Sequence, residues 1–184
     1  KVLFECKDLV IGYNSPLTKP MNIIFERNKK IAIKGVNGLG KTTLLKTLIG
    51  MQTPYSGIVE KDPYVEIGFF KQEEAAINKT ALEYIWDEFP DRNNGEIRSM
   101  LAKCGLTTEH IQSLMKVLSG GENAKVRLCK IMNREANILV LDEPTNHLDV
   151  DAKASLQTAI KAFKGAVILV SHEPEFYLPI VDEV

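Results

Sequence analysis

The stretch Gly35–Thr43, with the sequence Gly-Val-Asn-Gly-Leu-Gly-Lys-Thr-Thr, constrains the fold more than any other part of the chain. It fits the pattern G-x-x-x-x-G-K-[ST], in which a strand leads into a glycine-rich phosphate-binding loop and a helix follows. Residues 30–34 form a short run with the β-branched residues Ile31 and Ile33 at alternate positions, as in a strand. Apolar residues in 44–49 recur at helical spacing and Gly50 then stops the pattern. The sequence therefore predicts a phosphate-binding loop between a strand and a helix.

Each residue type in this loop has a physical task. Gly38 and Gly40 can adopt backbone angles that other residues avoid, so successive N–H groups can turn towards an anion. The positive end of the helix macrodipole adds to the attraction. The Lys41 ammonium can reach the β- and γ-phosphates, and the Thr42 hydroxyl can bind Mg²⁺. The predicted nucleotide-binding residues of the loop are Gly35, Asn37, Gly38, Gly40, Lys41, Thr42 and Thr43.

The pattern of the remaining segments predicts an α/β fold. Residues 137–141 and 166–170 are continuous apolar runs, as expected of parallel strands that are buried on both faces. A helix is expected between them, from about 151 to 163. Shorter strands are expected at 2–6, 21–26, 58–60 and 65–70, the first two in an antiparallel layer. We therefore expect the core of a P-loop NTPase, with a mostly parallel sheet, an N-terminal antiparallel β layer and an inserted helical lobe.

One domain is expected over residues 1–184, with the core at about 1–72 and 135–184 and the helical lobe at about 73–134. The chain does not begin with Met, so we expect it to be a piece of a longer protein. No apolar run reaches the roughly 18 residues of a membrane-spanning helix. The three cysteines lie far apart and match no metal or disulfide spacing, which favours free thiols in a reducing cytoplasm. With 23 basic and 24 acidic residues, the net charge of −1 gives no basic footprint of a nucleic-acid binder.

A pair of carboxylates follows the apolar run 137–141. Asp142 lies where the carboxyl end of a central strand faces the ligand crevice of an open α/β sheet. Beside a phosphate-binding loop, Asp142 is expected to bind Mg²⁺ through water, and Glu143 to polarise a water that attacks the γ-phosphate. Pro144 is expected to hold Glu143 extended, because a residue before proline is disfavoured in the α region.

The segment Leu118-Ser119-Gly120-Gly121-Glu122 lies between these two motifs and resembles the signature of ATP-binding-cassette (ABC) ATPases. The whole chain is similar to one nucleotide-binding domain of that family. The resemblance implies ATP hydrolysis, with ATP and Mg²⁺ as ligands. It implies that Tyr13 stacks on adenine and that Gln72 senses Mg²⁺ and the γ-phosphate. It also implies that Leu148-Asp149 forms the D-loop, which crosses to a partner domain, and that His172 is the switch histidine that contacts the γ-phosphate.

These assignments define the candidate residues of the site within this chain. The candidate catalytic residues are Lys41, Glu143 and His172, and the candidate Mg²⁺ site comprises Thr42, Gln72 and Asp142. The other two histidines, His110 and His147, are expected to be structural.

The signature has a physical logic of its own. Ser119 can cap the helix that begins at Gly120, and its hydroxyl together with exposed N–H groups can form a second anion site. In the family, the residues that correspond to Ser119, Gly120, Gly121 and Glu122 close over the γ-phosphate that a facing domain holds. One phosphate loop and one signature make two half-sites. The resemblance therefore implies a second cassette as partner, either upstream in the same chain or in a homodimer.

The last signature residue points to one branch of the family. Glu122 stands where transporter cassettes usually carry Gln, and with residues 146–149 and 171–176 it resembles the ABC-F branch. That branch comprises soluble twin-cassette proteins that act on ribosomes, some of which give antibiotic resistance. Only residues 73–117 separate Gln72 from the signature, which is more like a second cassette than a first. Two positions depart from the branch pattern: Glu173-Pro174 replace Asp-Arg, and Lys125 replaces a common Arg.

Three functions follow from the sequence. We expect a cytoplasmic ABC-F-like translation or resistance factor, for which the resemblance implies the ribosome and its RNA as partner. The alternative is the ATPase subunit of an ABC membrane transporter, which would dock on transmembrane helices beside Gln72. A third alternative, a P-loop kinase for a small molecule, is disfavoured by the signature. ATP is preferred over GTP only through the resemblance.

Overall fold

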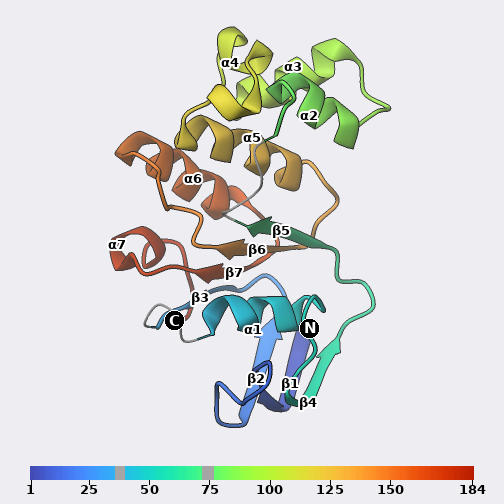
Figure 1. Cartoon of the computed structure of the whole chain (residues 1–184), viewed down its shortest axis with the longest axis vertical. Coiled ribbons are helices and arrows are strands. Elements are labelled where there is room, and N and C mark those ends of the chain that lie inside the picture. The colour runs from blue at the N-terminus through green and yellow to red at the C-terminus, as the bar shows by residue number, and fades with distance from the viewer. Residues whose placement is uncertain (36–39, 72–76) are drawn as a thin grey trace.

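The computed structural model describes residues 1–35, 40–71 and 77–184. Helix α1 (Lys41–Leu48) lies between two β-sheets of different kinds (Figure 1). The antiparallel sheet has the strand order β2-β1-β4, and the parallel sheet has the order β3-β7-β6-β5. The strands are β1 (Val2–Val10), β2 (Met21–Glu26), β3 (Lys30–Ile33), β4 (Ser56–Lys61), β5 (Ile67–Lys71), β6 (Ile138–Asp142) and β7 (Ala166–Val170).

Helix α1 is held between the sheets by apolar packing on both sides. Leu45 and Leu48 of this helix belong to one buried cluster with Phe4 of β1 and Ile168 of β7. Burial of such side chains stabilises the fold, because each Å² of apolar surface removed from water contributes about 25 cal/mol of free energy. This packing fixes α1 between the two sheets, and the Thr42 hydroxyl at its start donates a hydrogen bond to Asp142 at the carboxyl end of β6.

Further helices cover the other face of the parallel sheet and form a lobe at the end of the molecule away from the antiparallel sheet (Figure 1). Helices α5, α6 and α7 lie on the sheet, and α2, α3 and α4 make up the lobe. Their bounds are α2 (Ala81–Glu88), α3 (Asn94–Lys103), α4 (Thr108–Gln112), α5 (Gly120–Met132), α6 (Val150–Ala162) and α7 (Pro174–Tyr177), with a 3-10 turn η1 (Met115–Val117) before α5.

Helix α5 connects the sheet to the lobe. Ala124 and Leu128 pack in the cluster on the parallel sheet, whereas Val126 and Cys129 pack in the cluster of the lobe. The helix thus buries two faces, and its N-terminus carries the signature. The division into a core at 1–72 and 135–184 and a lobe at 73–134 remains a prediction, and α5 contributes to both.

Helices α2, α3, α4 and α5 each begin with a capping box, in which the N-cap side chain and the third helical residue exchange hydrogen bonds with the backbone. The pairs are Thr80 with Glu83, Asn93 with Glu96, Thr107 with His110, and Ser119 with Glu122. Three of the four use the usual glutamate at the third position. Helix α4 uses His110 instead.

The predicted fold class is confirmed. Every residue of β6 and β7 is buried, as the apolar runs predicted, and both strands pair in parallel. The helix predicted at about 151–163 is α6, which begins and ends one residue earlier. Strand β1 continues past residue 6 because the pairing shifts register between Cys6 and Leu9, where Asp8 has a φ of +47°. A register shift lets the chain keep pairing through the polar pair Lys7-Asp8.

Two predicted groups of residues fall outside the described residues. Asn37 and Gly38 of the phosphate loop, and Gln72, belong to the segments 36–39 and 72–76. Within the described ranges, no helix has the length and apolar character that crossing a bilayer requires.

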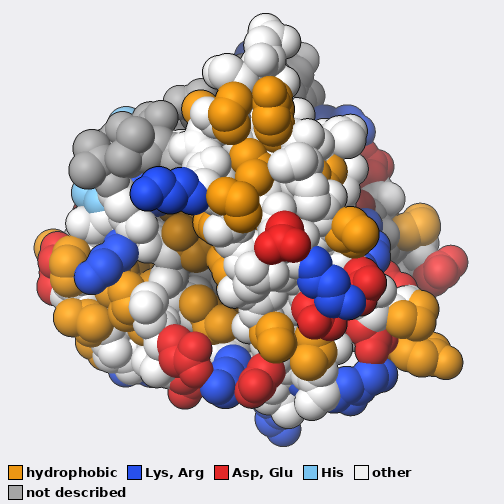
Figure 2. Space-filling view, turned by 90° about the horizontal axis from the view of Figure 1, so that it is seen from below, with side chains coloured by type: hydrophobic (Ala, Val, Ile, Leu, Met, Phe, Trp, Pro, Cys, Tyr) orange, Lys and Arg blue, Asp and Glu red, His pale blue; other side chains and the backbone are white. Residues whose placement is uncertain are grey.

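The end of the molecule that carries the antiparallel sheet has apolar and charged side chains interspersed on its surface (Figure 2). Ile24 is 54% exposed, and Ile58 is 57% exposed. The Lys7 ammonium lies 3.0 Å from the Glu60 carboxylate on the neighbouring strand.

Truncation of a buried residue in β6 should cost far more stability than truncation on this surface. Leu139 is fully buried, so Leu139→Ala should lower the free energy of unfolding by about 3 kcal/mol through lost burial and a residual cavity. The exposed control Ile24→Ala should cost about 0.5 kcal/mol or less. Chemical denaturation of both variants measures this. Equal losses would contradict the proposed place of β6 at the centre of the core.

Candidate active site

A cleft of about 560 Å³ opens at the carboxyl edge of the parallel sheet, beside the N-terminus of α1. The cleft brings together eight of the predicted site residues from four separate parts of the chain. They are Tyr13, Gly40, Lys41, Thr42, Thr43, Asp142, Glu143 and His172. The end of the predicted phosphate loop, the predicted magnesium ligands Thr42 and Asp142 and the predicted switch histidine thus lie around one space.

The start of α1 is shaped to receive an anion. Gly40 is the N-cap residue and has a φ of +84°, a left-handed conformation that favours glycine. The backbone N–H groups of the first helical turn have no partner within the helix itself, and the positive end of the macrodipole lies there. Phosphate groups bind at such termini in many proteins.

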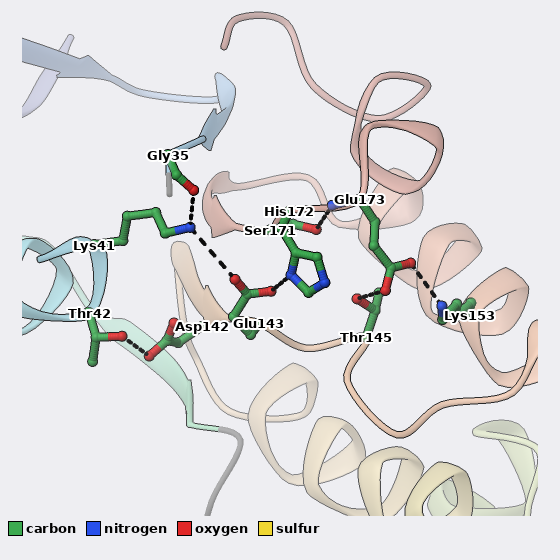
Figure 3. A network of polar contacts seen from close by, with 10 residues as sticks. All are labelled: Gly35, Lys41, Thr42, Asp142, Glu143, Thr145, Lys153, Ser171, His172 and Glu173. Carbon is green, nitrogen blue, oxygen red and sulfur yellow. Dashed lines mark hydrogen bonds and ion pairs between the residues drawn. The ribbon is translucent and has the colours of Figure 1, made fainter. Parts of the chain in front are cut away.

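Lys41 places a cation in the same cleft (Figure 3). Its Nζ donates a hydrogen bond to the Gly35 carbonyl at 2.6 Å and lies 3.9 Å from Glu143 Oε1. The side chains of Lys41 and Glu143 are only 10% and 16% exposed, so the two charges attract each other more strongly than on an open surface. Lys41 and Glu143 therefore face the same point in the cleft.

Thr42 and Asp142 form a pair that suits a divalent cation. The Thr42 hydroxyl donates a hydrogen bond to Asp142 Oδ2 at 2.9 Å. Asp142 Oδ1 is buried and has no hydrogen-bond partner among the residues that the structure describes. Burial raises the pKa of the Asp142 carboxyl, and the Thr42 hydrogen bond acts against that rise. A buried carboxylate oxygen without a partner, next to a hydroxyl, fits the oxygen ligands that Mg²⁺ prefers.

The backbone of Glu143 differs from the prediction. Its φ is +45°, so it is left-handed, and the expected extended conformation before Pro144 is wrong. The proline disfavours the right-handed α region, which leaves both extended and left-handed conformations open. The Glu143 N–H donates to the Val170 carbonyl at 2.9 Å and so continues the β6–β7 pairing by one residue. A left-handed non-glycine residue costs of order 1–3 kcal/mol and is often found at functional sites.

The turned backbone aims the Glu143 side chain at His172. His172 Nδ1 lies 2.9 Å from Glu143 Oε2, and Lys41 approaches the other carboxylate oxygen (Figure 3). Glu143 is thus held between a lysine and a histidine, at the mouth of the cleft where a water could reach it.

A second set of polar contacts fixes the loop that carries His172 (Figure 3). The Glu173 side chain accepts a hydrogen bond from the Thr145 hydroxyl at 3.2 Å and from Lys153 Nζ, on α6, at 2.8 Å. The Glu173 N–H donates to Ser171 Oγ at 3.1 Å. The sequence alone does not predict this network, because its members are distant in sequence and only the packing of α6 against the sheet brings them together.

Tyr13 lies at the outer rim of the cleft. Its hydroxyl oxygen accepts a long hydrogen bond, of 3.5 Å, from the Thr43 hydroxyl, and the residue is 57% exposed. The ring therefore keeps accessible surface on which a planar base could stack.

The signature residues do not line this cleft in the part of the chain that the structure describes. Ser119 and Gly120 are exposed at the start of α5, where Ser119 Oγ accepts a hydrogen bond from the Glu122 N–H at 3.2 Å. Asp149 is the exposed N-cap of α6, and its side chain accepts from the Ala152 N–H at 2.8 Å. The signature and the D-loop are thus presented outwards, towards a surface from which another molecule could approach.

The fold and these arrangements define an ATP-binding-cassette ATPase domain. Residues 18–146 match the family model described as "ABC transporter", and this match covers more than half of the sequence. The chain belongs to this family, as its resemblance predicted.

Known proteins that the chain resembles carry different descriptions. It is 57% identical over 184 residues to the "Uncharacterized ABC transporter ATP-binding protein YfmM" of Bacillus subtilis. That alignment covers 100% of this chain and 36% of that protein. It is 38% identical to "ABC transporter F family member 2" of Arabidopsis thaliana over 97% of this chain and 27% of that protein. The chain therefore spans about a third of the length of such relatives or less.

Solved structures show the same fold. A structure described as "Putative ABC transporter (ATP-binding protein)" from Pyrococcus furiosus is 26% identical and superposes with a TM-score of 0.82. The alignment covers 98% of this chain and 96% of that one.

Replacement of Asp142 by asparagine should separate stability from metal binding. Burial raises the pKa of the Asp142 carboxyl, so its charged form destabilises the folded state at neutral pH. This penalty disappears below the pKa that the carboxyl has in the unfolded chain, because there it is protonated in both the folded and the unfolded state. Asp142→Asn keeps an acceptor for Thr42, and the metal-free protein should gain about 1 kcal/mol, or a few degrees in Tm, at neutral pH. The gain should shrink on acidification.

The same variant should lose the extra thermal stabilisation that Mg²⁺ adds to ATP. Thermal unfolding across pH, with and without Mg²⁺ and ATP, measures both effects. A variant that is less stable at neutral pH, yet keeps its response to Mg²⁺, would show that Asp142 is a structural residue.

Proposed function

We propose that this domain binds Mg²⁺ and ATP in the cleft and hydrolyses ATP as one half of a two-cassette sandwich. The observation that carries the proposal is the division of the polar residues into two places. Lys41, Asp142 and Glu143 gather in the cleft, whereas the Ser119 loop is exposed outside it. Among the residues that the structure describes, the signature is therefore not part of the cleft that its own chain forms.

In this proposal each cleft residue has one task. Lys41 exchanges its hydrogen bond with Gly35 for the β- and γ-phosphates, and the N–H groups at the start of α1 hold the same anion. Thr42 and Asp142 hold Mg²⁺, together with Gln72 by resemblance, and this ion neutralises phosphate charge. Tyr13 stacks on the adenine. The two phosphate-loop residues Asn37 and Gly38 are assigned to the same anion by the motif alone.

Glu143 and His172 perform the proton chemistry. The Glu143 carboxylate takes a hydrogen bond from a water in line with the γ-phosphate. It accepts the proton of that water as the new P–O bond forms and the bond from the γ-phosphorus to the β–γ bridging oxygen breaks, so that ADP leaves with that oxygen. His172 lies 2.9 Å from Glu143 and keeps the carboxylate in place through Nδ1–H, and the cationic form of the ring also donates through Nε2–H to a γ-phosphate oxygen. The contacts of Glu173 hold the histidine loop.

The second half-site comes from the partner. Ser119, Gly120, Gly121 and Glu122 of one cassette close over the γ-phosphate that is bound to the other, and Asp149 crosses the same interface. Closure is favoured only while ATP is present, because ATP alone gives the closed state its additional contacts. Hydrolysis removes those contacts and the pair reopens.

For the whole protein we propose an ABC-F-like factor in the cytoplasm, with a second cassette in the same chain and the ribosome as partner. The resemblance of Glu122 and the short lobe to that branch supports this, as do relatives whose names place them in subfamily F. The alternative, an ABC transporter subunit, is favoured by one observation: the 57% identical relative is described as an ABC transporter ATP-binding protein.

Glu143→Gln should trap the closed state. The amide keeps the shape of the side chain but cannot accept the proton, so ATP hydrolysis should fall by at least about 100-fold while ATP binding is kept. The control Lys41→Ala should instead weaken ATP binding itself, because it removes the cation from the cleft. Steady-state hydrolysis and nucleotide titration distinguish the two. Hydrolysis at the wild-type rate by Glu143→Gln would remove the proposed base.

Co-sedimentation tests the proposed partner. The full-length protein with Glu143→Gln should sediment with ribosomes in the presence of ATP and not with ADP, because only ATP supports closure. The matched control is the full-length protein with Lys41→Ala and ATP. Association with detergent-solubilised membrane proteins, but not with ribosomes, would support the transporter alternative.

A further inference from the structure

Two capping boxes in the molecule are joined through their third helical residues. At the start of α5, Glu122 Oε2 accepts a hydrogen bond from the Ser119 N–H at 2.7 Å. At the start of α4, His110 Nδ1 accepts one from the Thr107 N–H at 3.2 Å. The other polar atom of each side chain faces its counterpart, since His110 Nε2 lies 3.0 Å from Glu122 Oε1.

These contacts select one form of the His110 ring. Nδ1 accepts a hydrogen bond and so carries no proton, which places the proton of the neutral ring on Nε2. The Nε2–H group therefore donates to Glu122 Oε1. The hydrogen bonds from Ser119, above all that of its N–H, lower the pKa of Glu122, which favours the carboxylate that both donors require.

The pair acts on Ser119 through Glu122. The backbone N–H of Ser119 is bound by the Glu122 side chain, and Ser119 Oγ is bound by the Glu122 N–H at 3.2 Å. The Ser119 hydroxyl also hydrogen-bonds the Glu122 carboxylate, so both the backbone and the side chain of Ser119 are held by Glu122. His110 and Glu122 are 28% and 29% exposed, so neither side chain is held by burial alone.

We propose that His110 is a positioning residue for the signature. It holds the Glu122 carboxylate, and through it Ser119, in the conformation that receives the γ-phosphate of a facing cassette. The inference rests on the proposed two-cassette function and adds to it a specific link between α4 and the signature. The sequence alone had indicated only a structural role for His110.

The same geometry gives a physical reason for glutamate at position 122 of this chain. A glutamine has a single acceptor oxygen, which the Ser119 N–H would use. Its NH₂ group would then face the Nε2–H of His110, donor against donor. A carboxylate at position 110 would reverse the requirement, because it would accept from Thr107 and from a glutamine amide but would repel a second carboxylate.

A double-mutant cycle tests this in the full-length protein, with the variants Glu122→Gln, His110→Glu and the two combined. Each single change should lower kcat for ATP about tenfold through the loss of one charge-assisted hydrogen bond. The affinity for ATP should not change, because the cleft around Lys41 is untouched. The combined variant should recover most of kcat. Glu109→Gln, an exposed neighbour on α4, is the matched control and should behave as wild type.

Hydrogen exchange at the Ser119 amide provides a second measurement that does not depend on turnover. Exchange should be faster in both single variants and return towards the wild-type rate in the combined one. Wild-type exchange and kcat in Glu122→Gln would overturn the proposal. So would a combined variant as impaired as the two losses added together.

The two measurements separate this proposal from the proposed function. Restored exchange without any response of kcat, together with no ATP-driven closure in Glu143→Gln, would mean that the two-cassette mechanism fails and that His110 only stabilises the helix start. Closure in Glu143→Gln without coupling between positions 110 and 122 would leave the mechanism standing and refute the role of His110.

Discussion

The pairing of β6 with its two neighbours is the constraint on which the site depends. Because β6 runs parallel to β5 and β7, the carboxyl ends of all three strands meet at one edge, where Asp142 pairs with Val170. The Glu143 N–H extends the same pairing to the Val170 carbonyl. Burial of the strand on both faces fixes its register, since a slip of one residue would exchange the two faces. A run of apolar residues thus sets the position of two carboxylates.

The sequence predicted those parts of the site that lie next to a strong local pattern. Lys41 and Thr42 follow a glycine-rich loop, Asp142 follows a buried strand, and the structure brings all three together. The backbone of Glu143 could not be predicted, because proline excludes one region of conformational space without choosing between the others. Contacts such as that of Lys153 with Glu173 depend on how α6 lies on the sheet, which no local pattern encodes.

In the short helical lobe, too, a contact between distant residues could not be predicted from the local sequence pattern. A helical lobe could be predicted from the sequence, and the capping boxes of α2 and α3 follow the usual pattern with glutamate. His110 carried no such signal, because histidine is an unusual third residue in a capping box. Only the distance of 3.0 Å to Glu122 shows that its second nitrogen is used by another helix.

The two half-sites differ in how far their polar groups are satisfied within the domain. In the cleft, Asp142 Oδ1 is buried without a partner among the described residues, and Glu143 has a strained backbone. A ligand that supplies a cation and accepts hydrogen bonds would remove the cost of leaving Asp142 Oδ1 buried without a partner. At the signature, Ser119 and Glu122 already exchange both hydrogen bonds of the capping box. In the proposed two-cassette mechanism the preorganised signature would lose little entropy on docking, whereas the cleft would gain most from its ligand, so nucleotide binding should precede closure.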